Sequence, residues 1–396
     1  MVKIMFLSKK IRLLPTPEQE ILFWKSAGTA RWAYNYFLGE NEKLYNEYLA
    51  NGKQGQKYIS GNELRKYINN VLKKTTHTWL SEVGSNVMKQ AVKDSERALK
   101  DFFDGKKGRP RYKSKRKDVP SFYVNYENLK RTDNGFRGEK IGKVKTSESL
   151  PKLKQGQHYA DPRIIYDGKY WYLSVSYDVD PYQVELTGES LGIDLGIKDL
   201  AICSNGKTYK NINKTKRVKQ LKKRLKREQR KLSRKMESDI KGYTSNRKPM
   251  FDRSLDECKN FQKQKAKIKS LYKKLYDIRT NHLHQTTTEI VKTKPSRIVL
   301  EDLNVQGMMK NRHLSKAIAE QGFYEFKRQM TYKCELYGIE LVTADRYYPS
   351  SQTCSKCGNV KKDLKLSDRI YHCDCCGLTI DRDFNASLNL ARYNLV

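Results

Sequence analysis

The sequence has few hydrophobic residues and no long apolar run. Only 37% of its 396 residues are hydrophobic. It contains no run of about eighteen consecutive apolar residues, the length that would suggest a membrane span. The opening MVKIMFLSKKIRLL has a short apolar patch but no signal-peptide cleavage pattern. These absences predict a cytoplasmic protein that does not cross a membrane.

Acidic residues are scarce beside basic ones. The chain has 80 Lys and Arg against 44 Asp and Glu, a formal net charge of +36. Such a charge repels itself unless a polyanion lies against it, and nucleic acid fits because each neutralised phosphate releases counterions. The 26 Tyr and 4 Trp are more than a histone-like or ribosomal protein usually carries. They indicate folded layers and stacking surfaces.

Two common catalytic patterns are missing as well. The sequence shows no Ser-His-Asp or Cys-His arrangement and no G-x-x-x-x-G-K-[ST] phosphate-binding loop. Neither a serine or cysteine hydrolase nor a P-loop nucleotidase is therefore expected. The eight cysteines of a large intracellular chain favour metal binding or free thiols over disulfides.

The first 104 residues read as a helical module after a strand from Lys3 to Leu14. Thr16 is suited to cap a long helix, with Pro17 at its first position and Gln19 completing a capping box. Hydrophobic periodicity predicts two more helices, over 62–73 and 79–103.

A strongly basic segment follows, and then a region with strand-like alternation. Eight of the twelve residues in 106–117 are Lys or Arg. They could form a solvated linker or a phosphate-binding loop, and the net charge favours phosphate. Residues 119–180 alternate and turn as a small β-domain would. The candidate phosphate contacts in the segment are Lys106, Lys107, Arg109, Arg111, Lys113, Lys115 and Arg116.

Residues 191–212 predict three short strands, and two basic helices follow. The stretch 214–235 holds thirteen Lys and Arg. Apolar residues recur in both helices at heptad-like spacing, which predicts an antiparallel hairpin with one seam and a basic outside. The seam residues are Val218, Leu221, Leu225 and Leu232 in the first helix and Ile268, Leu271, Leu275 and Ile278 in the second; the candidate nucleic-acid contacts are Arg224, Arg227 and Arg230.

The connection between these helices, GYTSNRKPMFDRS, is expected to be a mobile linker. Beyond the hairpin, 297–303 reads as a buried strand, followed by a helix that Gly338 stops, another strand, and a last helix at 384–393. The order of three strands, helices, strand, helix, strand and helix is typical of an RNase H-like α/β layer.

Four cysteines have the spacing of a structural zinc site. Cys354 and Cys357 form one C-x-x-C pair, and Cys373 and Cys376 form a second, each followed by glycine. Four thiolates suit tetrahedral zinc and leave no position open for substrate. Cys375 and His372 could compete as ligands, although the paired spacing favours the first four.

Three acids are candidates for a second metal site. Asp194 interrupts the apolar LGIDLGI, where a charge is costly unless it is paired or metal-bound. Glu301 ends the apolar IVLE, with Asp302 beside it, and Asp383 opens the last helix. Either Asp383 or Asp381 could simply cap that helix. Meeting at the edge of one sheet, the three acids would hold two Mg²⁺ ions for phosphodiester hydrolysis.

Long ordered blocks of the sequence resemble the TnpB family, which comprises transposon-associated RNA-guided nucleases regarded as ancestral to type V CRISPR effectors. The blocks are LLPTPEQ, ARWAYNYFL, ALKDFFDGKKGRPRYKSKRK, GIDLGIKDLAICSNG, LEDLNVQGMMKNRHLSKAIAEQGFYEFKRQMTYKCELYG, RYYPSSQTCSKCG and CGLTIDRDFNAS. The resemblance implies a RuvC nuclease of RNase H fold with Asp194, Glu301 and Asp383 as its catalytic triad. The choice of Asp383 over Asp381 depends on this resemblance.

The resemblance also implies a division of the chain into domains. A small β-barrel wedge domain would take its first strand from 1–14 and the rest, with the basic linker, from 105–185. A helical recognition lobe would span 15–104. The RuvC domain would occupy 186–349, with the basic hairpin at 214–280, and would finish with the helix in 381–396. Between these parts, 350–380 would be a zinc-ribbon insertion that loads the target strand.

The implied partners are a guide RNA and double-stranded target DNA. Pairing would read the sequence, while the protein reads a short adjacent motif and cuts both strands with one RuvC site. Some relatives have lost the acids and repress transcription without cutting, whereas all three are intact here. A zinc-bearing scaffold without a guide and a CRISPR-associated effector are further alternatives. The protein is expected to be prokaryotic, associated with the nucleoid, and monomeric with one RNA.

Overall fold

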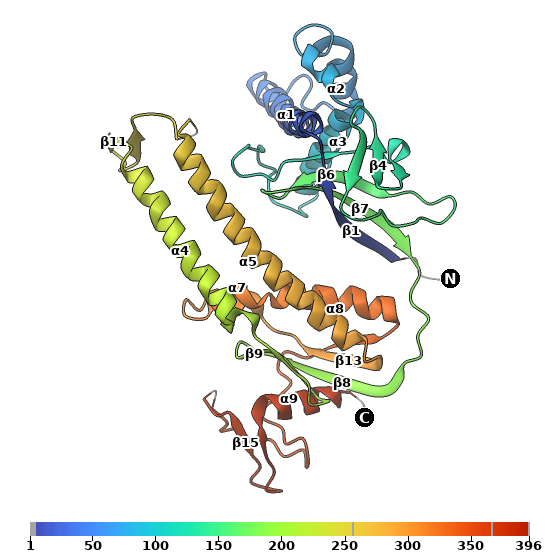
Figure 1. The fold of residues 1–396 in the computed structure, drawn as a ribbon, viewed down its shortest axis with the longest axis vertical. Helices are drawn as coiled ribbons and strands as arrows, with labels where there is room; N and C mark the ends of the chain where they lie inside the picture. Colours follow the sequence, from blue (N-terminus) through green and yellow to red (C-terminus); the bar gives the residue numbers. More distant parts are fainter. Residues whose placement is uncertain (1–4, 256, 366, 395–396) are drawn as a thin grey trace. The chain divides into compact units, whose positions relative to one another are not determined.

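The chain folds into two compact units. The structure is a computed structural model that describes residues 5–255, 257–365 and 367–394. One unit ends at Val179 and the other begins at Asp180 (Figure 1). The expected first strand is seen as β1, Met5–Leu14, and its predicted start at Lys3 lies outside the described residues. So do the last two residues of the segment 381–396.

The first unit contains three α-helices: α1 (Pro17–Ala50), α2 (Gly61–Tyr67) and α3 (Ser85–Phe103). The predicted capping box begins α1, because the Gln19 amide donates to Thr16 Oγ1 and the Thr16 amide donates to Gln19 Oε1. The helix expected over 79–103 is shorter, since extended backbone at Gly84 separates α3 from a 3₁₀ turn at Thr78–Glu82. A π-helical turn, Ile68–Leu72, extends α2.

The β-domain of the first unit is one seven-stranded sheet. Its order is β2-β6-β7-β1-β5-β4-β3, and β1 pairs antiparallel with both β7 and β5. The end strands β2 and β3 are not paired with each other in the described part of the chain, so the expected barrel is open. The further bounds are β2 Ser121–Tyr123, β3 Lys130–Thr132, β4 Gly135–Gly138, β5 Gly142–Thr146, β6 Ala160–Tyr166 and β7 Trp171–Val179, with a 3₁₀ turn at Tyr126–Asn128.

Helices and sheet of this unit share one hydrophobic core. Phe23 of α1 is fully buried, with its ring 5.3 Å from Trp171 on β7 and 5.9 Å from Phe122 on β2. Edge-to-face and tilted ring pairs of this kind add to the stabilisation that burial provides. The helical module and the β-domain, which the sequence suggested as separate domains, therefore form a single packed body.

The second unit is built on a five-stranded sheet with the order β10-β9-β8-β13-β14. Strands β8, β9 and β10 are antiparallel, whereas β13 is parallel to both β8 and β14. This sequence of strands and helices is the one predicted from the pattern of an RNase H-like layer. The bounds are β8 Thr187–Leu195, β9 Asp199–Cys203, β10 Thr208–Lys210, β13 Pro295–Glu301 and β14 Glu340–Ala344.

A long helical hairpin projects from this sheet. After a 3₁₀ turn at Ile212–Lys214, α4 (Lys216–Glu237) and α5 (Lys259–Val291) lie side by side (Figure 1). The eight apolar residues predicted for the seam form one cluster between them. The connection expected to be a mobile linker instead contains two paired strands, β11 (Ile240–Tyr243) and β12 (Pro249–Phe251).

The remaining elements complete the second unit. Helix α8 packs against α5, and α9 packs against β8. Helix α8 ends at Gly338, which has a left-handed φ of 70° as the predicted stop requires. A two-stranded ribbon of β15 and β16 precedes α9. The bounds are α6 Val305–Met309, α7 Ser315–Gln321, α8 Phe323–Tyr337, β15 Ile370–His372, β16 Thr379–Asp381 and α9 Arg382–Ala391.

Candidate active site and cysteine cluster

Three separate elements bring the predicted acids to one edge of the second sheet. Asp194 lies near the end of β8, Glu301 ends β13, and Asp383 is in the first turn of α9. The parallel register pairs Leu300 with Ile193. Glu301 and Asp194 each follow a member of that pair, so they leave the sheet at adjacent positions.

A glycine allows α9 to approach β8 closely enough to add Asp383 to this edge. A Cβ at Gly192 would lie 2.0 Å from the Ser387 carbonyl oxygen and 2.3 Å from the Ala391 nitrogen. Real Cβ atoms do not come this near backbone atoms, so only glycine permits this contact. The apolar setting of Asp194 was evident in the sequence, whereas this role of Gly192 was not predicted. The available signal for this close contact was the presence of a glycine, Gly192, inside a strand and two residues before Asp194.

The carboxyl group of Asp194 is held in unfavourable surroundings. Burial, and next the charges of Asp383 and Glu301, raise its pKa to about 8. Among the described residues it has no hydrogen-bond or ion-pair partner. A buried carboxylate without a cation is destabilising, which is the condition that a bound metal ion relieves.

Glu301 and its neighbour Asp302 have different roles in the structure. Burial, and then the charge of Asp302, raise the pKa of Glu301. Asp302 instead accepts from Arg346 at 2.6 Å and lies 3.6 Å from Lys327, and the Arg346 hydrogen bond foremost lowers its pKa. Asp302 is thus already neutralised by two cations, and Glu301 is left as the candidate ligand.

The two acids at the start of α9 are likewise distinguished by their contacts. Asp381 Oδ1 accepts from the amides of Asp383 and Phe384, both at 3.0 Å, and so caps the helix. Asp383 lies 3.4 Å from Arg382 and electrostatically raises the pKa of Asp194 more than Asp381 does. The geometry therefore separates a capping aspartate from one that faces the other acids.

The four predicted cysteines form a compact cluster. The sulfur atoms of Cys354, Cys357, Cys373 and Cys376 all lie within 4.8 Å of one another, with two of the pairs at 3.5 and 3.6 Å. Tetrahedral zinc with bonds of about 2.3 Å would place its sulfurs about 3.8 Å apart. These distances fit four thiolates around one ion and are too long for disulfides.

The competing ligands lie outside this cluster. Cys375 is exposed, and His372 Nδ1 lies 2.9 Å from Thr379 Oγ1 across the β15–β16 ribbon. The amides of Cys376 and then Cys375 donate to the sulfur of Cys373 and lower the pKa of that thiol. This favours the thiolate that a metal ion requires.

The carboxylates do not form a second cluster of that tightness in the part of the chain that is described. Carboxylates that would hold separate ions need not converge on one point. Mutual repulsion among three carboxylates also keeps them apart when no cation lies between them.

Four of the eight basic residues in segment 106–117 pair with acids of their own unit. The ion pairs are Lys106–Asp104 at 2.9 Å, Lys107–Asp101 at 2.6 Å, Arg109–Glu42 at 2.9 Å and Arg111–Asp118 at 2.8 Å. These side chains are therefore less available to phosphate than their number in the sequence suggested, while Lys115 and Arg116 are exposed.

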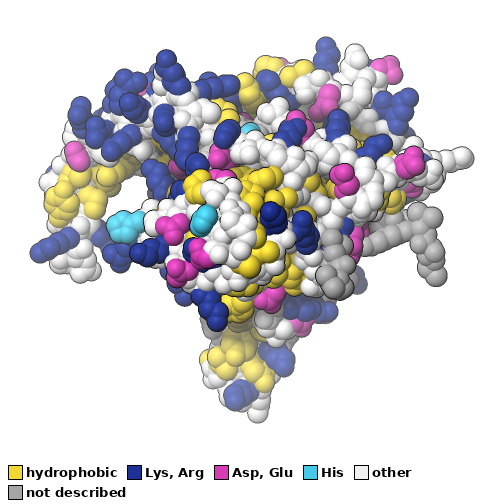
Figure 2. Space-filling model, turned by 90° about the horizontal axis from the view of Figure 1, so that it is seen from below, with side chains coloured by type: hydrophobic (Ala, Val, Ile, Leu, Met, Phe, Trp, Pro, Cys, Tyr) yellow, Lys and Arg dark blue, Asp and Glu magenta, His cyan; other side chains and the backbone are white. Residues whose placement is uncertain are grey.

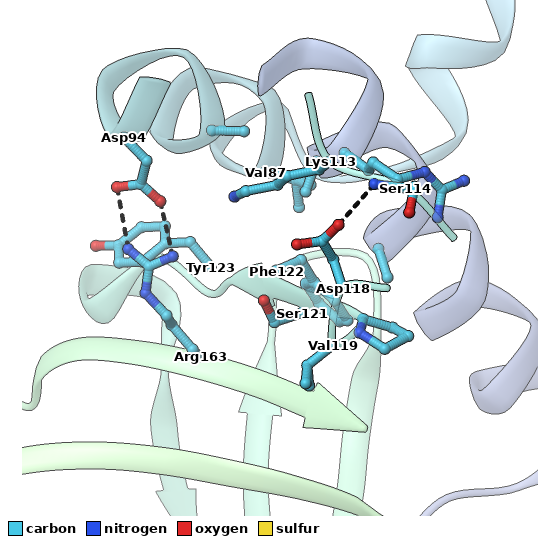
Figure 3. A pocket seen from close by; sticks show the side chains of 15 residues that line it. Val87, Asp94, Lys113, Ser114, Asp118, Val119, Ser121, Phe122, Tyr123 and Arg163 are labelled. Atoms are coloured by element: carbon cyan, nitrogen blue, oxygen red, sulfur yellow. Dashed lines mark hydrogen bonds and ion pairs between the residues drawn. The ribbon is translucent and has the colours of Figure 1, made fainter. Parts of the chain in front are cut away.

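Lys113 of this segment lies at a small cavity. Its Nζ is 3.8 Å from the centre of the Tyr34 ring, and burial lowers its pKa. Figure 3 shows it beside the cavity, whose volume is about 110 Å³, with the Asp94–Arg163 ion pair on the other side. The Ser114 amide donates to Asp118 at 2.7 Å and holds the segment in place. Lys113 is a packed residue of this unit, with little of it open to solvent.

Helix α4 presents a basic groove of about 710 Å³. The predicted Arg224, Arg227 and Arg230 line it. Seven of its nine lining residues are Lys or Arg, and none of the seven has an ion-pair partner among the described residues. Arg217, Lys223 and Lys226 belong to the predicted basic outside of 214–235 but were not singled out, and Lys274 of α5 was not predicted. Arg217, Arg224 and Arg227 are seven and three residues apart, which places them on one face of a helix, and this spacing was the available signal.

Lys and Arg side chains are spread over much of the face drawn in Figure 2, with Asp and Glu between them.

Among the described residues, no helix is both long and apolar enough to cross a membrane.

Comparisons with known proteins identify the family. Models described as "Probable transposase", "Cas12f1-like, TNB domain" and "Helix-turn-helix domain" match residues 174–312, 323–390 and 5–50. A Streptomyces pristinaespiralis protein named "Putative RNA-guided DNA endonuclease" is 30% identical over 98% of this chain and 89% of its own length. An Escherichia coli K12 protein of the same description is 28% identical over 96% of this chain and 90% of its own. The chain belongs to the TnpB family.

A solved structure shares the fold. The Cas12f1 protein in a complex with guide RNA and target DNA superposes with a TM-score of 0.54 at 14% identity, over 98% of this chain and 99% of that one. At this identity the likeness shows the fold alone, which this chain shares with the Cas12f1 protein. The range matched as helix-turn-helix is occupied here by β1 and the single long helix α1.

Proposed function

We propose that this protein is an RNA-guided DNA endonuclease that binds a guide RNA, recognises a short target-adjacent motif and cleaves double-stranded DNA at one carboxylate site. The observation that carries the proposal is the meeting of Asp194, Glu301 and Asp383 from β8, β13 and α9. The names of the TnpB relatives support the guided activity, and intact acids favour cutting over guided repression.

The acids have separate tasks in this proposal. Two Mg²⁺ ions, when bound, would lower the pKa of an attacking water and stabilise the leaving oxygen. Asp194, between the other two, would contact both ions, with Glu301 on one side and Asp383 on the other. Asp381 caps α9 and Asp302 pairs with Arg346, so these two neighbouring acids have other partners and are not assigned as ligands.

The cysteine cluster would bind one structural Zn²⁺. It fits because all four sulfurs are already near one another and no position is left open. A ribbon of two three-residue strands buries too little apolar surface to fold without such a support. This segment would be the target-strand-loading insertion, and the first unit would supply the recognition lobe (15–104) and the wedge.

Plasmid cleavage tests the proposal. Protein purified with its RNA should linearise a plasmid that carries the matching target and adjacent motif when Mg²⁺ is present. Asp194→Ala should reduce the rate by about a hundred- to a thousandfold, the size expected when a group that stabilises the transition state is lost, while the RNA stays bound. Target binding without any cutting by the parent would indicate a guided repressor, and failure to retain one defined RNA would indicate a scaffold without a guide.

A second measurement tests where phosphates are held. Changing Arg224 and Arg227 to Gln should reduce the slope of log affinity against log salt by about one for each lost contact. Changing Lys106 and Lys107 to Gln should reduce it less, because their ammonium groups are already paired with Asp104 and Asp101. Equal slopes for the two double variants would contradict the assignment of phosphate contacts to the groove.

A further inference from the structure

Three strongly exposed tyrosines lie on two adjoining helices of the second unit. Tyr272 and Tyr276 of α5 are 52% and 64% exposed, and Tyr324 of α8 is 76% exposed. Single exposed aromatic residues are common on protein surfaces. What distinguishes these three is their position relative to one another and to the carboxylates.

The two tyrosines of α5 lie on the opposite side of the helix from the basic groove. Leu271 and Leu275 face the seam with α4. Tyr272 and Tyr276 each follow a seam residue, whereas Lys274, which lines the groove, precedes Leu275. At about 100° per residue, the tyrosines and Lys274 point to opposite flanks of the hairpin. Gln229 of α4 donates to the Tyr272 hydroxyl at 2.7 Å and so fixes the orientation of that ring.

Helix α8 continues the same face. Tyr324 and Arg328 are four residues apart and therefore neighbours on its exposed side. The pKa of Arg328 is raised, first by its hydrogen bond to Glu325 and to a smaller extent by the hydroxyls of Tyr332 and Tyr276. Helices α5 and α8 pack against each other, and the Tyr276 hydroxyl acts electrostatically on the Arg328 guanidinium, so these two exposed side chains belong to adjoining parts of one surface. We call Tyr272, Tyr276 and Tyr324 the tyrosine face.

The helix that carries Tyr324 also contacts the residue next to a candidate ligand. Lys327, three residues after Tyr324, lies 3.6 Å from Asp302, which directly follows Glu301 in the chain. A polymer lying on the tyrosine face would thus pass along α8 to the edge of the sheet where the three acids are.

The charges on this face differ from those in the groove. Arg328 pairs with Glu325 at 2.7 Å, Lys327 with Asp302, and Lys273 with Asp277. The seven basic residues of the groove have no such partners in the described chain. Paired cations attract phosphates weakly, whereas exposed rings can stack on bases of any sequence. The groove is therefore suited to the sugar-phosphate backbone of a nucleic acid, and the tyrosine face is suited to unpaired bases.

We propose that the tyrosine face is a stacking platform for unpaired bases of a DNA strand that approaches Asp194, Glu301 and Asp383. The proposal rests on the endonuclease function proposed above and adds the route by which a single strand reaches the acids. Stacking does not distinguish one base from another, which suits a site that must accept any target sequence.

The test measures single-strand binding by the complex of protein and RNA, with Asp194→Asn to prevent cleavage. The probe is a short single-stranded oligodeoxynucleotide that contains 2-aminopurine, whose fluorescence is quenched when it stacks. Tyr276→Ala and Tyr324→Ala should each weaken binding by about tenfold and relieve quenching, because each removes one stacking ring. The salt slope should stay unchanged, since no phosphate contact is lost.

Conservative and distant variants serve as controls. Tyr276→Phe keeps the ring and should bind as the parent does. Tyr243→Ala removes an equally exposed ring, 63% exposed, from β11 at the tip of the hairpin and should have no effect. Unchanged binding and quenching in both tyrosine-face alanine variants would overturn the proposal, as would a dimer in solution that Tyr276→Ala dissociates.

Plasmid cleavage by the protein with Asp194 intact separates the two proposals. If that protein cuts its target while the alanine variants bind single strands normally, only the stacking platform is wrong. If it neither retains RNA nor cuts, the endonuclease function itself is wrong.

Discussion

The four clustered cysteines and the three candidate acids are brought together in opposite ways. The four cysteines come from 23 consecutive residues, Cys354 to Cys376, and two tight turns bring their sulfurs together. The three acids come from strands and a helix up to 189 positions apart, Asp194 to Asp383. The four sulfurs are already close to the spacing that tetrahedral zinc requires, whereas the three acids hold like charges near one another. Removing a ligand should therefore affect stability with opposite sign at the two sites.

The largest effect is expected at the cysteines. Cys354→Ser should release most of the zinc and strongly lower the soluble yield or melting temperature, because metal binding supplies the folding free energy of the ribbon. Zinc content is measured by elemental analysis and stability by thermal unfolding. Cys375→Ser is the matched control, since Cys375 is exposed and outside the cluster, and it should keep its zinc. A fully zinc-loaded Cys354→Ser protein would show that the cluster is assigned wrongly.

A large effect is also expected where α9 meets β8. Gly192→Ala should displace α9 and with it Asp383, because the new methyl group would overlap backbone atoms of the helix. Overpacking of this kind costs about 1–3 kcal/mol, and we expect DNA cleavage to fall at least about a hundredfold, as misplacing reacting groups by about 1 Å does. Gly188→Ala on the same strand meets nothing within 4 Å and should cleave normally. Similar rates for the two variants would mean that the close contact does not position Asp383.

A smaller effect, of opposite sign, is expected at Asp194. The pKa of this carboxyl is raised to about 8 from its ordinary 3.8, so its ionisation destabilises the folded chain as pH rises through that interval. Without divalent cations, Asp194→Asn should raise the melting temperature by about 5 °C at pH 8, which corresponds to about 2 kcal/mol, and by much less near pH 4.

Magnesium should reverse this difference. Added Mg²⁺ should stabilise the parent more than Asp194→Asn. In the parent the ion would bind the folded state through the Asp194 carboxylate, which the variant lacks. Melting curves of both proteins at the two pH values, with EDTA or with Mg²⁺, measure the destabilisation by the ionised carboxylate and the stabilisation by the bound ion. A lower melting temperature of Asp194→Asn in EDTA would show that the carboxylate is stabilising, and the contrast with the cysteine cluster would be lost.

The smallest effect is expected at Asp381. Asparagine is as good a helix cap as aspartate, so Asp381→Asn should retain stability and most cleavage activity, whereas Asp381→Ala should cost about 1 kcal/mol. Asp383→Asn should instead abolish cleavage with little change in stability. Cleavage rates and melting temperatures of the three variants distinguish the residue that caps the helix from the residue that would bind metal. Loss of cleavage in Asp381→Asn equal to that in Asp383→Asn would contradict the assignment.

Local signals in the chain were sufficient for several features. The capping box at Thr16, the apolar seam of the α4–α5 hairpin and the paired cysteines are each specified by residues near one another in sequence. Short-range spacing decides such features because helix turns and metal knuckles are themselves short-range. The strand pairing at 240–251 was missed because its few apolar residues lie among polar ones.

What remained undecided depended on residues far apart in the chain. Sequence gave no means of telling that acids such as Asp104 and Glu42 neutralise the basic segment 106–117, while the groove of α4 stays unpaired. It offered Asp381 and Asp383 as equals until the cap and the approach of α9 distinguished them. The sequence by itself determined which residues carry charge and thiols and which segments are helices. Only the tertiary structure decided which charges meet, because electrostatic and packing energies depend on distance in space.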